Sequence, residues 1–292
     1  MRALIHRPLA ILAGVCLLWC AAHLWMGRGA DAEFEQAHRG EVVVFGDSHA
    51  GDVRLPQAPR FAFPAQDLVS TWMWMDAFVR AGDADSKVKV VVLTVWPSKF
   101  LPLAERRLSG RIQEDRWGQS VLGRVGPVLG FRHMVEPAVP WRLRWRMLLN
   151  TFQLRSSIRT SGWDCQDRSI PSDYGFKMGT LVQEAPWFDG AKVSRWALGQ
   201  IVRLAESQSW ELVMLEHPMH RSFLDQVHLG AMADYEAALK AAAEHPRITY
   251  VDMARFPLPD SGFRDYHHLT CEGSAAVADR LEPLLEGWGI SP

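Results

Sequence analysis

Cysteine is scarce in this 292-residue chain, and the spacings that bind structural zinc are missing. The four cysteines form no CxxC pair and there is no HExxH, so we expect no metal. Nothing in the sequence calls for another cofactor. Cys16 and Cys20 fall in an apolar N-terminal run, whereas Cys165 and Cys271 lie in the remaining part. An oxidising compartment would permit a Cys165–Cys271 disulfide, but the sequence does not show whether the two meet.

A strong charge bias and an internal repeat are also absent. The formal net charge is −1 with no strongly basic field, which disfavours nucleic acid as a partner. Without a repeat, a solenoid is excluded. What the chain has instead is 48% hydrophobic residues, enough for the core of one large α/β domain. Most of the 13 tryptophans are expected in that core, with a sugar platform or a membrane contact as the alternative.

An apolar run covers residues 8–26 and follows a basic stretch, residues 1–7. At about 1.5 Å per residue, a helix of this length nearly spans a bilayer. The basic flank places the N-terminus in the cytoplasm and the remainder outside. We expect a single-pass anchor in the inner (cytoplasmic) membrane, a polar linker at residues 27–40 and a domain in the periplasm or outside the cell. A cleaved signal peptide is the alternative, since residues 30–32 resemble an A-x-A site.

Strand and helix patterns alternate through residues 41–292. This alternation predicts a parallel sheet with helices on both faces. Residues 101–186 interrupt the pattern and are expected to form an insertion over the carboxyl edge of the sheet. Arginines and tryptophans cluster at residues 141–146, and we expect a solvated helix face there or a contact for lipid head groups or an anionic polymer. The expected strands are residues 42–45, 88–95, 211–216 and 248–252, and the expected helices are residues 68–81, 192–207, 232–243 and 273–285.

The first expected strand ends in a turn that carries a serine. Residues 42–49 read VVVFGDSH, in which Gly46 permits a sharp reversal and Ser48 follows at the carboxyl edge of the sheet, where open α/β folds bind ligands. A serine becomes nucleophilic when an imidazole takes its proton and a carboxylate orients that imidazole. Downstream, Asp265 and His268 supply both groups three residues apart, before the last helix. We therefore expect Ser48 as nucleophile, His268 as base and Asp265 as its orienting carboxylate.

Other side chains near this edge have alternative roles. His267 adjoins the expected base and is the alternative to it. Gly46 and Asp47 are expected to support the turn, Asp47 by accepting backbone N–H bonds, and His49 to begin the next helix. Several residues are candidate substrate contacts, with a loop or core role as the alternative: Trp96, His217 and His220.

These motifs resemble those of the SGNH/GDSL hydrolase superfamily. Gly46-Asp47-Ser48-His49 matches its first block, and residues 265–269 match its last. The resemblance implies a flavodoxin-like three-layer α/β/α sandwich over roughly residues 40–290, with Ser48, Asp265 and His268 as the triad. A GDSH block is similar to the membrane-linked branch that includes alginate and cellulose O-acetyltransferases.

The middle blocks depart from the family pattern. The family supplies a glycine after the second strand and an asparagine after the third, and both bind the oxyanion. Here residues 61–67 contain no glycine, and residues 95–99 contain no asparagine. A backbone N–H of Ala65 or Gln66, with that of Ser48, is expected to serve, and Ser98 to replace the asparagine. Because one lost donor costs about 3–4 kcal/mol, the departure favours a dedicated transferase or a degenerate site over a general esterase.

The expected function is transfer of an acetyl group to or from an extracellular polysaccharide through an acyl-enzyme on Ser48. Its partners would be a polysaccharide or other acylated glycan, the membrane, and a membrane acyltransferase that donates acyl groups. One alternative is an esterase or deacetylase that releases the acyl group to water. The second is a non-catalytic component that binds polysaccharide or acts as a scaffold. The sequence does not separate transfer from hydrolysis, since water access decides between them.

Overall fold

The computed structural model of the chain describes residues 32–62, 66–82, 85–100, 167–171, 192–227 and 229–290, with the single residues Gly14, Leu17 and Gly175. The expected membrane span at residues 8–26, apart from Gly14 and Leu17, lies outside these ranges, as does nearly all of the expected insertion at residues 101–186. Among the described residues, no helix has the length and apolar character needed to cross a membrane.

Five parallel strands form one sheet in the order β2-β1-β3-β4-β5. This is the strand order of flavodoxin-like doubly wound sheets, in which the order reverses at β1 and β3. Ligands of such sheets bind outside the carboxyl ends of the strands at that switch point. The strands are β1 (Val42–Gly46), β2 (Arg60–Ala62), β3 (Val90–Val95), β4 (Glu211–Glu216) and β5 (Ile248–Asp252).

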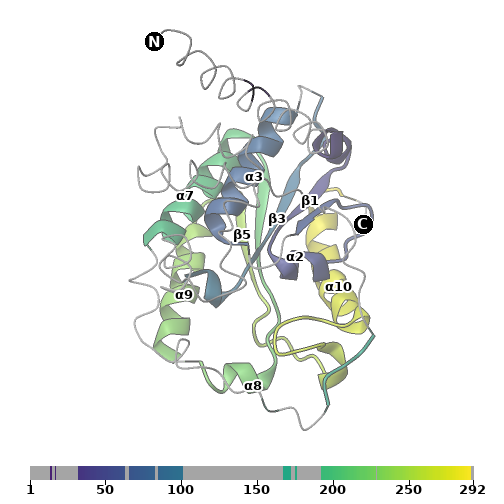
Figure 1. Cartoon of the computed structure of the whole chain (residues 1–292), viewed down its shortest axis with the longest axis vertical. Coiled ribbons are helices and arrows are strands. Elements are labelled where there is room, and N and C mark those ends of the chain that lie inside the picture. Colours follow the sequence, from purple (N-terminus) through teal and green to yellow (C-terminus); the bar gives the residue numbers. More distant parts are fainter. Residues whose placement is uncertain are drawn as a thin grey trace, which may run out of the picture.

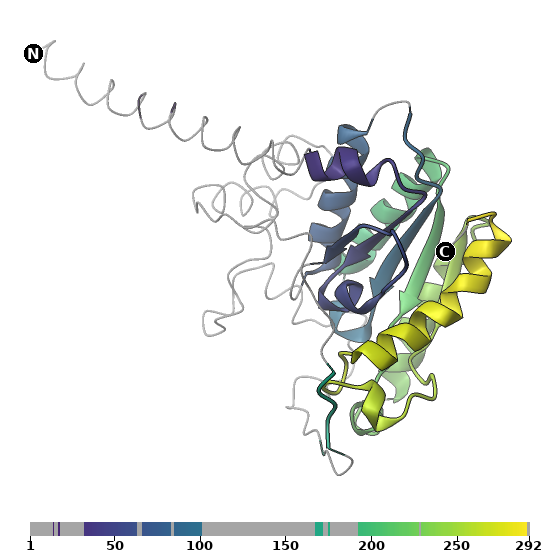
Figure 2. The same ribbon diagram turned by 90° about the vertical axis from the view of Figure 1, so that its right-hand side faces the viewer.

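Helices cover both faces of the sheet, so the domain has three layers (Figures 1 and 2). One layer holds α3, α7 and α9, and α10 forms the opposite layer together with the short α2. The layered α/β architecture expected from the sequence is therefore present. The helices are α2 (Ser48–Asp52), α3 (Leu68–Ala81), α7 (Lys192–Ser207), α8 (Arg221–Leu224), α9 (Leu229–Ala242) and α10 (Cys271–Gly287), with 3₁₀ turns η1 (Pro97–Phe100) and η4 (Asp260–Gly262).

Alternation of side chains along the buried strands builds two separate cores. In β1, Val43 and Phe45 pack toward α3, whereas Val42 and Val44 pack toward α10. Successive side chains of a strand point to opposite faces, so a strand covered on both sides must be apolar at every position. The continuous apolar run of β1 follows from this requirement.

The segment expected to be a linker, residues 27–40, is in part a piece of the domain. Residues 32–37 are helical, and Phe34 is fully buried. Its ring lies 5.0 Å from that of Phe61 and 5.5 Å from those of Trp74 and Phe78, all edge-on. The boundary expected at residue 41 is therefore wrong, because one aromatic side chain in a polar stretch anchors that stretch in the core.

Candidate active site

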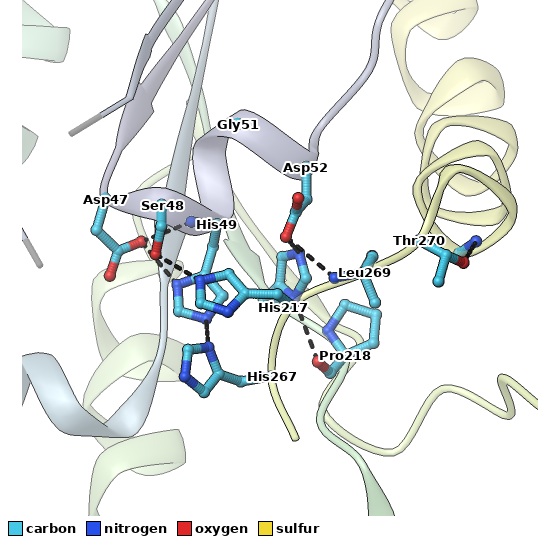
Figure 3. A network of polar contacts seen from close by, with 12 residues as sticks. Asp47, Ser48, His49, Gly51, Asp52, His217, Pro218, His267, Leu269 and Thr270 are labelled. Atoms are coloured by element: carbon cyan, nitrogen blue, oxygen red, sulfur yellow. Dashed lines mark hydrogen bonds and ion pairs between the residues drawn. The ribbon is translucent and has the colours of Figure 1, made fainter. Parts of the chain in front are cut away.

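The turn after β1 carries the nucleophile candidate. A Cβ on Gly46 would lie 1.9 Å from the Thr94 Oγ1 atom, so only glycine fits where β1 passes β3. Asp47 caps α2 by accepting a hydrogen bond from the His49 backbone N–H at 3.1 Å. The expected turn-supporting roles of Gly46 and Asp47 match these contacts, and Ser48 becomes the first residue of α2 (Figure 3).

Three side chains expected to act together lie in one hydrogen-bonded row. The Ser48 Oγ atom is 2.8 Å from His268 Nε2, and His268 Nδ1 is 2.7 Å from Asp265 Oδ2. The carboxylate fixes the proton on Nδ1, which leaves the Nε2 lone pair to accept the serine proton. This is the arrangement that general-base activation of a serine requires.

Asp265 is held by its own loop as well as by the imidazole. Its Oδ1 atom accepts backbone hydrogen bonds from His267 at 3.0 Å and His268 at 2.8 Å. Burial acts to raise the pKa of Asp265, but the hydrogen bond from His268 and the nearby imidazoles outweigh it and hold the pKa below its usual range. The carboxylate is thus ionised at neutral pH and orients His268.

A second chain of histidines lies against the triad, and sequence reasoning missed it. His49 Nδ1 is 2.7 Å from Asp47 Oδ1, and His49 Nε2 is 2.9 Å from His267 Nδ1. The His49 ring also stacks on that of His268, with centroids 5.2 Å apart. His49 does lie in the expected helix. Its contact with His267, 218 positions away, has no signal in the sequence.

Lys99 is a second residue that the sequence did not mark. It follows β3 and is 3% exposed, with Nζ donating to the Thr94 carbonyl at 2.7 Å and lying 3.8 Å from Asp47 Oδ1. Burial lowers the pKa of Lys99, and Asp47 and Asp67 partly offset this. For Asp47, burial alone would raise the pKa, but its interactions with His49 and Lys99 bring it below its usual range. The carboxylate beneath the nucleophile turn is therefore ionised.

The expected oxyanion donors are only partly described. Ala65 lies outside the described residues, and so does the side chain of Ser98, whose backbone belongs to η1. Gln66 is buried; with its amide oriented to satisfy both ends, it donates to the Gly46 carbonyl at 2.6 Å and accepts from the Thr71 N–H at 3.2 Å. The Gln66 side chain thus braces the nucleophile turn.

The expected substrate contacts occupy different places. Trp96 borders the histidines, with its ring 4.9 Å from that of His49 and 4.7 Å from that of His267. His217 is 1% exposed beside His49 and lies 3.9 Å from Asp52 Oδ2. Burial, reinforced by the neighbouring His49, lowers the pKa of His217 well below its usual value.

His220 is also buried, and its contacts are with other residues. It caps α8 by accepting from the Ser222 N–H, and its Nε2 lies 3.3 Å from Asp260 Oδ1. Of the three expected contacts, Trp96 and His217 are therefore placed beside His49, which stacks on His268, and His220 serves the local structure of its loop.

The segment that carries Asp265 and His268 is fastened to α2 and α10. Asp52, the last residue of α2, accepts from the Leu269 backbone N–H at 3.1 Å. Thr270 then caps α10 by accepting from the Gly273 N–H at 3.3 Å. Cys271 is disulfide-bonded, whereas Cys165 lies outside the described residues, so the Cys165–Cys271 pairing stays a prediction.

Three imidazoles, those of His49, His267 and His268, place one nitrogen each within 4.8 Å of one another. A metal ion would need nitrogen lone pairs that already serve hydrogen bonds. Both His268 nitrogens bond within the triad, and both His49 nitrogens bond to Asp47 and His267. Binding of a metal would therefore dismantle the serine–imidazole contact, and the arrangement is suited to moving protons.

Comparisons with known proteins add little. No family model matches the chain, and no curated protein matches it. Among solved structures, the chain is similar to a Streptococcus pneumonia protein described provisionally as a platelet activating factor. The two share 11% identity and a TM-score of 0.40, over 94% of this chain and 99% of the other. A likeness at this level defines neither the fold nor the activity of this chain.

Proposed function

We propose that the protein is a serine acyl-transfer enzyme of the SGNH/GDSL type, tethered to the membrane by residues 8–26 and exported, which acetylates an extracellular polysaccharide. One observation carries the enzymatic part, namely the row of Ser48, His268 and Asp265 with contacts of 2.8 and 2.7 Å. The GDSH block and the tryptophan-rich segment support a polysaccharide as the acceptor. The strand order supports the SGNH fold.

The first half-reaction would acylate Ser48. As Oγ attacks the acyl carbon, its proton passes to His268 Nε2, and Asp265 stabilises the resulting imidazolium. The bond from the acyl carbon to the leaving group then breaks, and His268 gives its proton to that group. The product is an ester on Ser48 with His268 neutral again.

The second half-reaction would reverse these proton movements. The acceptor hydroxyl attacks the acyl carbon, its proton passes to His268, and the bond to Ser48 Oγ breaks as that proton is returned to the serine. A sugar hydroxyl gives transfer and a water molecule gives hydrolysis. Both outcomes use the same residues, so their partition must be measured.

Acetylation by p-nitrophenyl acetate tests the proposal directly. We expect a burst of p-nitrophenol and an acetyl group on the peptide that contains Ser48, both lost in Ser48→Ala. Ser207→Ala, a hydroxyl at the exposed end of α7, is the matched control and should label like the wild type. Equal labelling of Ser48→Ala would refute the proposal. Added cello-oligosaccharide then reports the partition, and exclusive release of acetate to water would identify a hydrolase.

A further inference from the structure

We propose that His267 binds a second hydroxyl of the acceptor, adjacent to the hydroxyl that attacks the acyl group, so that the site selects acceptors with neighbouring hydroxyls. The inference rests on the proposed function, since it assigns the acceptor side of the same site. It arises from the chain Asp47–His49–His267, which the triad chemistry leaves unused.

The directions of the hydrogen bonds that link Asp47, His49 and His267 follow from the Asp47 carboxylate, which can only accept. Asp47 is an ionised acceptor, so the proton between it and His49 must lie on His49 Nδ1. When His49 is neutral, its Nε2 atom has only a lone pair, and the 2.9 Å contact requires His267 Nδ1 to donate. His267 therefore carries its proton on Nδ1 and presents a lone pair at Nε2.

The Nε2 atom of His267 is the open end of the chain. No hydrogen bond to it occurs within the described ranges, and none of the buried polar atoms there that lack a partner belongs to His267. The side chain is 12% exposed. Nε2 therefore reaches solvent as a hydrogen-bond acceptor that a ligand hydroxyl can use.

The position of the ring places this acceptor next to the reaction. The His267 centroid is 4.0 Å from that of His268, whose Nε2 contacts Ser48. The Trp96 ring, 4.7 Å away, and the Tyr266 ring, 4.2 Å away, flank it. Two neighbouring hydroxyls of one sugar ring could thus meet the two imidazoles together, the attacking one at His268 and its neighbour at His267.

The chemistry of His267 restricts what it can bind. Burial, followed by the neighbouring imidazoles of His49 and His268, lowers its pKa well below the usual value, so it stays neutral beside an imidazolium at His268. A neutral ring with Nε2 unprotonated cannot donate to an oxyanion. It accepts from an O–H group, and the site therefore selects a hydroxyl donor at this position.

The tautomer is the first test, and it does not depend on any activity. In the detergent-solubilised full chain with ¹⁵N-labelled histidine, the His267 signals are those missing from the His267→Asn spectrum. We expect a protonated Nδ1 and an unprotonated Nε2 at neutral pH. A protonated Nε2, or an imidazolium, would overturn the inference.

Acceptor choice is the second test. After acetylation by p-nitrophenyl acetate, ethylene glycol and 2-methoxyethanol compete as acceptors; they are similar in size, but the second lacks the neighbouring hydroxyl. We expect the wild type to favour ethylene glycol by about tenfold, as one hydrogen bond to the bound acceptor provides. His267→Asn keeps a donor toward His49 but removes Nε2, and should reduce the preference to about the twofold statistical value of two hydroxyls.

His267→Gln places an amide oxygen near the Nε2 position and should restore part of the preference. The preference is a ratio of two products formed from the same acyl-enzyme, so it does not depend on how much acyl-enzyme each variant accumulates. A preference unchanged in His267→Asn would overturn the role of His267 and leave the proposed function standing. Absence of a burst in the wild type would instead refute the proposed function, and the tautomer would still be decided by the spectra.

Discussion

At the residue scale, the two carboxylate oxygens of Asp265 have separate partners. Asp265 uses Oδ1 for two backbone N–H groups and Oδ2 for His268. The loop therefore positions the carboxylate, and the carboxylate positions the imidazole. A change that alters one oxygen affects the tautomer of His268 before it affects the fold.

Asp265→Asn should separate orientation from charge. An amide can offer an N–H to His268 Nδ1 and so favour the tautomer with the proton on Nε2, which cannot accept from Ser48. We expect kcat of acetyl release to fall by roughly 10³–10⁴-fold with little change in thermal stability. The control is Asp260→Asn, a carboxylate that pairs with Arg221 and His220 and should leave kcat unchanged. A loss below tenfold for Asp265→Asn would contradict the assigned role.

Gly46→Ala tests the close approach of β1 and β3. The added methyl would meet Thr94 Oγ1, and such overpacking typically costs about 1–3 kcal/mol of unfolding free energy. Adding Thr94→Ala removes the clashing oxygen, so the double variant should regain most of the loss in urea unfolding. If the losses in unfolding free energy of the two single variants simply add in the double variant, glycine is required at position 46 for its backbone conformation and not for the contact with Thr94.

Sequence reasoning located the triad but not the residues around it. Ser48 follows an apolar strand, and Asp265 and His268 share a short spacing, so both features are local. Lys99 and His49 are recognisable only once they are buried with Asp47. Burial of these side chains depends on contacts between distant segments, and a single sequence carries no pattern for it.

At the element scale, α10 holds the base through its first turn. A Cβ on Gly273 would lie 2.1 Å from the Gly262 carbonyl oxygen, so η4 and α10 touch through bare backbone. The segment with Asp265 and His268 lies between η4 and α10. The spacing between these two elements therefore sets the position of His268, the proposed base.

Gly273→Ala should therefore reduce the acylation rate by more than tenfold and lower the unfolding free energy by about 1–3 kcal/mol. Gly287→Ala, at the other end of the same helix, has open space around the new methyl. It should be neutral or stabilising by up to about 1 kcal/mol, because alanine favours helix. Burst kinetics give the acylation rate of both variants, and urea unfolding gives their unfolding free energy. Similar values for the two variants would contradict a tight contact between Gly273 and Gly262.

The long strands and helices were predictable, and the short ones were not. The predicted helices at residues 68–81 and 192–207 match α3 and α7 in their bounds. The strand β2 was missed, because Arg60–Ala62 is three residues long and begins with an arginine that donates to the Gly51 carbonyl. Three residues carry no periodicity, so this edge strand exists through its pairing with β1.

At the scale of the whole molecule, one buried acid couples stability to pH. Glu216 at the end of β4 is fully buried and accepts a hydrogen bond from the Tyr250 hydroxyl. Burial raises the pKa of Glu216 to about 8. Between its ordinary pKa of 4.5 and this value, the folded state keeps a proton that the unfolded state has lost.

The free energy of unfolding should consequently decrease as pH rises through that window, by up to about 1.4 kcal/mol per pH unit from this group, and level off above it. Glu216→Gln keeps an acceptor for Tyr250 and should remove this contribution. Urea unfolding of both proteins at several pH values between 5 and 9 measures the difference. Parallel curves would exclude Glu216 as its source.

Phe34 tests the extent of the domain. Phe34→Ala in the full chain should lower the unfolding free energy by about 3–5 kcal/mol, the usual loss for a buried phenylalanine. Phe34→Leu keeps most of the volume and should cost less than half as much. No measurable loss for Phe34→Ala would return residues 32–40 to the role of a linker.

Asp52 links the segment that carries His268 to the same short helix that carries Ser48. The helix α2 begins with the proposed nucleophile, Ser48, and ends with the Asp52 carboxylate, which accepts from the Leu269 N–H next to the proposed base, His268. Two groups that are 220 positions apart in sequence are thus referenced to a single helical turn. Small shifts of strands elsewhere in the sheet therefore need not change the distance between Ser48 and His268. The rest of the domain can diverge in sequence while the two side chains stay aligned.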